Sequence, residues 1–91
     1  MMVFRTRDKT YSGASALDIV RALQQDAADA RLRASAPRDY LRWAHAQLRD
    51  RVPARDLDVS DRLCEETLAF GYLCLCDEYG VAELSGAPQG V

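Results

Sequence analysis

Hydrophobic and polar positions along the chain predict three helices, the last of which is apolar on every side. The longest uncharged run, residues 67–76, reads TLAFGYLCLC and lies in a segment that starts at Ser60-Asp61, with Ser60 or Asp58 as the expected N-cap, and stops at Gly80. At about 100° per residue, its apolar side chains point in all directions over the middle turns. We therefore expect a central helix that begins near Ser60 and ends with Gly80 as its left-handed cap. Either the rest of the chain encloses it, or a second copy or a partner protein covers what remains.

Two amphipathic helices are predicted before this central one. The first begins at Ser15, a capping residue, and its end is open within residues 29–34. The second runs from about Pro37 to Arg51, because proline favours the first helical turn and Pro53 cannot continue the ladder. The apolar positions of the first are Ala16, Ile19, Val20, Leu23, Ala27 and Ala30, and those of the second are Tyr40, Leu41, Ala44, Leu48 and Val52, with Trp43 at the margin.

The two ends of the chain are typical of strands. Alternation over residues 2–13 predicts a β-hairpin with Asp8 and Lys9 in the turn, and residues 81–84 suit a short strand beside it. The predicted fold class is therefore α+β: an N-terminal β-hairpin, three helices with the apolar third helix at the centre, and a short C-terminal strand. We expect residues 1–84 to form a single domain and residues 85–91, SGAPQGV, to be a disordered tail.

Composition narrows the possible functions only slightly. Ninety-one residues with 48% hydrophobic and 29% charged side chains suit one globular domain. The formal charge of -2 gives no general attraction to nucleic acid or to an anionic membrane. No leader sequence and no apolar run of membrane-spanning length is recognisable, and the three cysteines are an odd number, so we expect a cytoplasmic protein with reduced thiols.

No set of residues predicts catalysis, a metal site or a cofactor. Cys74 and Cys76 are two positions apart on a helix, so they point about 200° apart and cannot hold one ion together. The only histidine, His45, lies on a different helix and is expected on its solvent-facing side, with no nucleophile placed beside it. We expect the cysteines to pack as small core residues, with a redox or intermolecular disulfide role as the alternative. The adjacent acids Glu65 and Glu66 diverge on a helix and are expected to be solvated.

A basic ridge is predicted along one side of the second helix. Its members are spaced i, i+4, i+7 and i+11 and are Arg38, Arg42, His45 and Arg49. Three interpretations remain open: a solvated face paired with nearby carboxylates, a contact for an acidic partner protein, and a contact for nucleic acid phosphates. The third helix has no basic residue after Arg62, which disfavours a DNA-recognition role for that helix.

The sequence favours a small non-enzymatic protein-interaction module that acts as a homodimer, an adaptor or a regulatory subunit. Its partner would be a second copy or another protein, and no membrane contact and no small-molecule substrate is expected. The predicted contact lies on the third helix and comprises Gly71, Tyr72, Leu75 and Tyr79, because a helical glycine allows close approach of another helix. The alternative is a nucleic-acid-binding regulator that uses the basic ridge.

Overall fold

The computed structural model describes residues 1–57 and 62–87 and confirms the α+β class. Its elements are β1 (Met2–Arg5), β2 (Thr10–Gly13), α1 (Ala16–Gln25), α2 (Ala30–Ala34), α3 (Pro37–Arg51), α4 (Glu65–Glu78) and β3 (Glu83–Gly86). The expected central helix is α4. The short helix α2 is the element that the hydrophobic pattern did not separate from α1.

The strands form one antiparallel sheet with the order β2-β1-β3. In β1, Met2 and Phe4 are 0% and 2% exposed and face the helices, as the alternation requires. The third strand was expected at residues 81–84 but is formed by 83–86, so Ser85 and Gly86 belong to the sheet and not to a tail. The remaining end of the predicted tail, residues 88–91, lies outside the described part of the chain.

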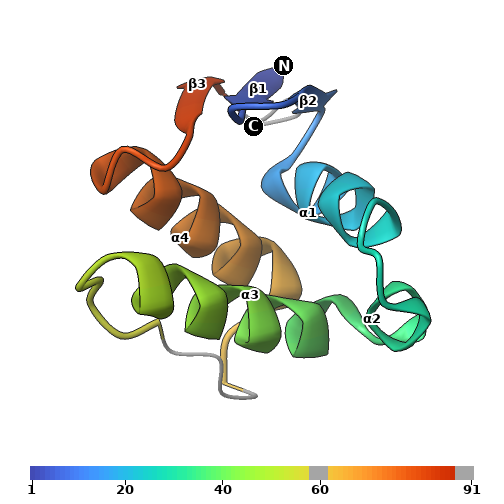
Figure 1. The fold of residues 1–91 in the computed structure, drawn as a ribbon. Coiled ribbons are helices and arrows are strands. Elements are labelled where there is room, and N and C mark those ends of the chain that lie inside the picture. Colours follow the sequence, from blue (N-terminus) through green and yellow to red (C-terminus); the bar gives the residue numbers. More distant parts are fainter. Residues whose placement is uncertain (58–61, 88–91) are drawn as a thin grey trace.

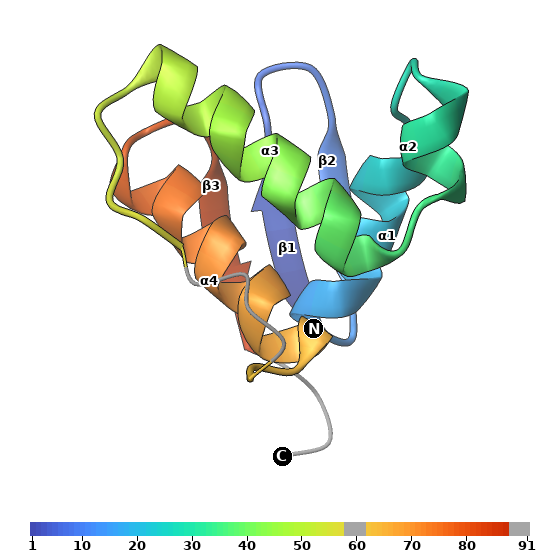
Figure 2. The same ribbon diagram turned by 90° about the horizontal axis from the view of Figure 1, so that it is seen from below.

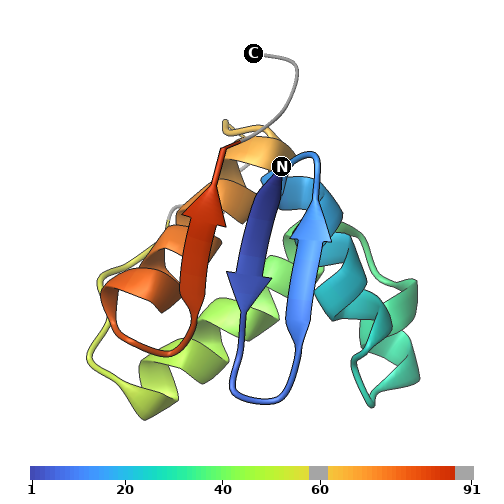
Figure 3. The same ribbon diagram turned by 90° about the horizontal axis from the view of Figure 1, so that it is seen from above.

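The elements are arranged in three layers. The sheet lies at the top of Figure 1, α1 and α4 pack against its lower face, and α3 crosses beneath both helices. Figure 2 shows α3 running across the two helices and the strands behind them. Seen from above, none of the described helices covers the outer face of the sheet (Figure 3). The core therefore lies between one face of the sheet and α3, and α1 and α4 enclose it from two sides.

Helix α4 begins later than the sequence predicted and ends where it predicted. Its N-cap is Cys64, whereas Asp58 and Ser60, the expected caps, lie outside the described residues. At the other end, Gly80 has a φ of 75°. Its N–H donates to Asp77 O, and the next N–H donates to Cys76 O at 2.8 Å, which together form a Schellman motif. Because this motif uses residues 80–82, β3 starts two positions later than the alternation suggested.

The chain encloses α4 on most sides but not on all. Leu68 and Leu73 are 0% exposed, whereas Phe70 is 42% exposed and Thr67 is exposed beside it. Of the two alternatives that the sequence left open, complete enclosure by the rest of the chain is therefore not what the described residues show for this face. Gly71, which was expected to admit a second helix, has Leu57 of the connector over it: a Cβ added there would lie 3.0 Å from Leu57 Cδ1.

The break between α1 and α2 has a local cause. The N–H of Asp26 donates to the carbonyls of Ala22 and Leu23 and so ends α1. Asp29 caps α2, because its side chain accepts from Arg31 N at 2.9 Å. Gln24, 3% exposed, fixes the connection: its Nε2 donates to Leu32 O at 2.8 Å and to Ser35 O at 2.6 Å. A buried side-chain amide thus satisfies the carbonyls that end α2.

Candidate functional site

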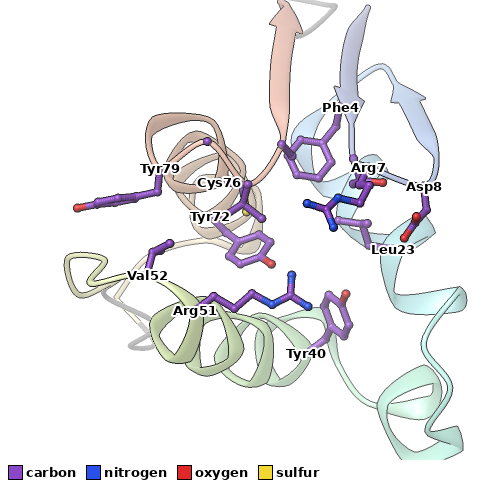
Figure 4. A pocket seen from close by; sticks show the side chains of 14 residues that line it. Phe4, Arg7, Asp8, Leu23, Tyr40, Arg51, Val52, Tyr72, Cys76 and Tyr79 are labelled. Carbon is purple, nitrogen blue, oxygen red and sulfur yellow. The ribbon is translucent and has the colours of Figure 1, made fainter.

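A cleft of about 640 Å³ opens between the β1–β2 turn, α3 and the C-terminal end of α4. This volume falls within the usual range for ligand-binding clefts, about 300–1,000 Å³. Figure 4 shows guanidinium groups of Arg7 and Arg51 and hydroxyl groups of Tyr40 and Tyr72 directed toward the same space. The apolar part of the lining is formed by Phe4, Leu23, Val52, Val81 and Ala82.

Three separate elements bring these polar groups together. Arg7 lies at the tip of the hairpin turn, which Thr6 closes by accepting from Lys9 N at 3.0 Å and by donating to Lys9 O. Tyr40 and Arg51 lie eleven positions apart on α3, about three turns, and so share one side of that helix. Tyr72 lies on the facing side of α4, one turn before Cys76.

The cleft carries a small excess of positive charge. Burial raises the pKa of Tyr72 well above its usual value and raises that of Cys76 to about 11, although Arg51 lowers both. Burial also raises the pKa of Tyr40. Both phenols and the thiol are therefore neutral at physiological pH, and the hydroxyls can donate hydrogen bonds. Among the lining residues the charged ones are Arg7, Arg51 and Asp8, which leaves a net charge of one positive.

A second, smaller hollow continues the cleft along α3. The two share Tyr40, Arg51, Tyr72 and Val81, and the hollow extends to Trp43 and Gln47. Trp43 is 42% exposed, and its ring centroid lies 5.8 Å from that of Tyr40. We call the cleft and this hollow together the groove. It runs from the hairpin turn to the only tryptophan of the chain.

The four residues expected to form a contact on the third helix do not share one surface. Tyr72 and Tyr79 both line the cleft, and Tyr79 Oη also accepts from Arg55 N at 3.2 Å. Leu75 is 1% exposed and belongs to the chain's own core, so it has no surface to offer a partner. Gly71 is on the side covered by Leu57. The structure therefore brings two of the four predicted residues together at the groove.

The members of the basic ridge are held by the chain itself. Arg38 donates from Nη2 to Leu63 O at 2.7 Å, Arg42 pairs with Asp39 at 3.1 Å, and Arg49 pairs with Asp56 at 2.7 Å.

His45 is 8% exposed, so the prediction that it faces solvent is wrong. Its Nε2 lies 3.1 Å from Arg55 O, because the connector after α3 folds back over this side of the helix. The pairing with nearby carboxylates, one of the three interpretations left open, is what the structure shows for Arg42 and Arg49.

Sequence reasoning missed Arg7, Arg51 and Tyr40 as site residues. The sequence did offer a signal for Arg51. This residue lies next to the apolar stripe of its helix, so its charged side chain is directed toward the neighbouring elements. Arg7 carried no such signal. Only the tertiary structure places it at the groove, because the hairpin turn lies across the cleft from α3 and the end of α4.

Residues 1–57 and 62–87 contain no candidate metal site and no candidate membrane span. No three side chains among the histidine, cysteine, aspartate and glutamate residues there gather to hold a metal ion. No helix in these ranges has both the length and the hydrophobicity needed to cross a bilayer. A scan of protein-family models, a search of curated proteins and a search of solved structures found no match to this chain.

Proposed function

We propose that this protein is a small non-enzymatic interaction module that contacts a partner protein through the groove. The observation that carries the proposal is Trp43, a large aromatic side chain that is 42% exposed at one end of a recessed surface. Single exposed apolar residues are common, but this one adjoins a hollow in which tyrosine and arginine side chains gather. Tryptophan, tyrosine and arginine are the residues most enriched in binding hot spots.

The groove also offers the physical conditions that such contacts need. Tyr40 belongs to the core and Tyr72 packs against it, so binding orders these two wall side chains at little additional cost in conformational entropy. The rings of Tyr40 and Tyr72 belong to this wall, and both hydroxyls remain able to donate. A partner side chain placed in the hollow would cover Trp43. Both side chains would then be removed from water, which is favourable for apolar surface.

The partner is a second copy or another protein, which makes the chain a homodimer, an adaptor or a regulatory subunit. The proposed location is the cytoplasm, since the three cysteines are an odd number and each is unpaired. Light scattering at high micromolar concentration distinguishes the two kinds of partner: a dimer that Trp43→Ser dissociates identifies a second copy.

The test of this function is affinity capture from the native host with matched surface variants. Phe70 is exposed to the same extent as Trp43, 42%, but lies on α4 and does not line the groove. We expect the wild type and Phe70→Ser to retain the same partner and Trp43→Ser to lose it, with all three proteins folded by circular dichroism. Retention by all three, or loss with Phe70→Ser alone, would remove the groove from the contact.

The nucleic-acid alternative has less support. Arg42 and Arg49 of the basic ridge each pair with a carboxylate of this chain, and His45 is buried. Phosphate contacts would first have to displace those carboxylates. A mobility-shift assay at two salt concentrations addresses this alternative directly, since phosphate binding weakens steeply with salt.

A further inference from the structure

The groove contains two arginines whose charge the described part of the chain leaves unpaired. Most arginines that lie outside it have a carboxylate partner: Arg5 pairs with Glu83, Arg31 with Asp29, Arg42 with Asp39, Arg49 with Asp56 and Arg55 with Glu78. Arg7 and Arg51 form no ion pair within residues 1–57 and 62–87. The two come from the hairpin turn and from the end of α3, and both guanidinium groups are directed into the cleft (Figure 4).

Donors surround this space on more than one side. The guanidinium groups present planar sets of N–H donors, which suit the oxygen atoms of a carboxylate or phosphate. Tyr40 and Tyr72 add neutral hydroxyls from two different helices. The only acid in the lining is Asp8, beside Arg7 in the turn. The cleft therefore complements an anionic group better than a neutral or cationic one.

The shape of the groove adds a second requirement. Phe4, Leu23, Val52 and Val81 give the cleft apolar walls, and the adjoining hollow leads along α3 to Trp43. A free inorganic anion would fill only the donor cluster and leave these walls in water. A chain with an acidic group and a neighbouring apolar side chain would use both parts.

We infer that the groove binds an acidic segment of the partner protein, with a carboxylate between Arg7 and Arg51 and an adjacent apolar side chain in the hollow beside Trp43. This inference rests on the proposed function and specifies the chemistry of the partner. The Tyr40 and Tyr72 hydroxyls complete the donor set. Arg51 is central, because it lines both the cleft and the hollow.

The experiment uses the full chain and the fluorescence of its single tryptophan, which lies at the groove. The probes are a short capped peptide of alternating glutamate and leucine, the same peptide with glutamine for glutamate, the same peptide with phosphoserine, and sodium acetate. We expect saturable perturbation of Trp43 emission by the glutamate peptide, at least tenfold weaker binding of the glutamine peptide, and weakening with salt. The tenfold difference, about 1.4 kcal/mol, reflects the loss of the charge-assisted hydrogen bonds to the carboxylate.

Matched arginine variants decide whether the effect is local. Arg7→Gln and Arg51→Gln should each weaken the glutamate peptide about tenfold. The control, Arg21→Gln, neutralises an exposed arginine of α1 that does not line the groove, and should leave affinity unchanged. All three positions are exposed, so the variants should fold, which circular dichroism checks.

Several results would overturn the inference. Equal affinity for the glutamate and glutamine peptides would remove the charge requirement. Equal loss in Arg21→Gln and Arg7→Gln would indicate general electrostatics. Binding of the phosphoserine peptide alone would mean that the groove recognises a phosphate and not a carboxylate. Competition by acetate at the peptide's own concentration would mean that the groove binds only a small anion. If Trp43→Ser loses the captured partner while Arg7→Gln and Arg51→Gln retain it, only the acidic chemistry fails and the interaction module stands.

Discussion

At the scale of single residues, Gln24 shows how one buried amide can hold three helices together. It lies in α1, and its Nε2 donates to a carbonyl of α2 and to Ser35, which precedes α3. Gln24→Glu would replace the donor by a carboxylate facing carbonyl oxygens. We expect a loss of about 1–3 kcal/mol in the free energy of unfolding at neutral pH, measured by urea denaturation. The control Gln25→Glu alters an exposed residue with one 3.5 Å contact and should change stability little; equal losses would contradict the role of Gln24.

The three cysteines should react at different rates because their surroundings differ. Cys64 is exposed, and its pKa is lowered chiefly by the hydrogen bond with the Thr67 side chain, with a contribution from the Thr67 backbone. Burial raises the pKa of Cys74 and raises that of Cys76 to about 11. We expect labelling of the native protein, mapped by mass spectrometry, in the order Cys64, Cys74, Cys76, because the thiolate is the reactive form. A single common rate for all three would be inconsistent with the described packing.

At the scale of elements, the first turn of α4 caps two other helices. Ala16 N and Leu17 N at the start of α1 both donate to the Glu66 carboxylate at 2.9 Å, and Arg38 N of α3 donates to Glu65 at 3.2 Å. A carboxylate at a helix N-terminus satisfies free N–H groups and complements the helix dipole. The expectation that these acids are merely solvated is therefore wrong.

The capping role gives a quantitative prediction. Glu66→Gln keeps the shape of the side chain but replaces one acceptor oxygen by an amide nitrogen. We expect a loss of about 1–2 kcal/mol in unfolding free energy, measured by thermal and urea denaturation. Glu78→Gln on the same helix removes only an exposed ion pair with Arg55 and should cost less than about 1 kcal/mol. Comparable losses in the two variants would argue against capping by Glu66.

The contact between the hairpin and α1 makes stability depend on pH. Lys9 Nζ and the Tyr11 hydroxyl both donate to Asp26, at 2.8 and 2.7 Å, and lower its pKa. The stabilisation is therefore present above the unfolded-state pKa of Asp26 and is lost as pH falls through the lowered folded-state value. Burial, with the bond to Asp26, raises the pKa of Tyr11 from 10.0 to about 12, so stability is also lost as pH rises between these values.

Urea midpoints measured across pH test this linkage. Asp26→Asn should flatten the acid limb, and Tyr11→Phe should flatten the alkaline limb between about pH 10 and 12. Asp50→Asn is the control, because Asp50 is exposed and forms no ion pair in the described residues, and its profile should follow that of the wild type. An unchanged acid limb in Asp26→Asn would show that the contact does not form in solution.

At the scale of the whole molecule, stability depends on a small core to which β1, α1, α3 and α4 all contribute side chains. Leu73 is 0% exposed, and Leu73→Ala should cost about 2–5 kcal/mol, a large part of the total stability of a domain of this size. Phe70→Ala, on the open face of the same helix, should cost less than about 1 kcal/mol. Chemical denaturation compares the two. A large loss for Phe70→Ala would mean that its face is covered in solution, as self-association would cover it.

The fold was predictable from the sequence wherever local periodicity and capping agreed. The bounds of α3, the hairpin and the glycine cap of α4 follow from Pro37, from alternation and from Gly80. The separate helix α2 was not predictable from the hydrophobic pattern, because side-chain hydrogen bonds from Gln24 and Asp29 define its ends. The groove was not predictable either, since Arg7 and Arg51 come to line one cleft only when the hairpin turn and α3 are placed on its opposite sides in the folded chain.

The sequence by itself determined where α1, α3, α4 and the hairpin form and that α4 contributes to the core, because these properties arise from side-chain spacing and caps within a few residues. Only the tertiary structure decided which face of α4 stays open and which arginines of the described residues form ion pairs. Burial and ion pairing depend on elements that are distant in the chain, and their positions are fixed by packing rather than by local pattern.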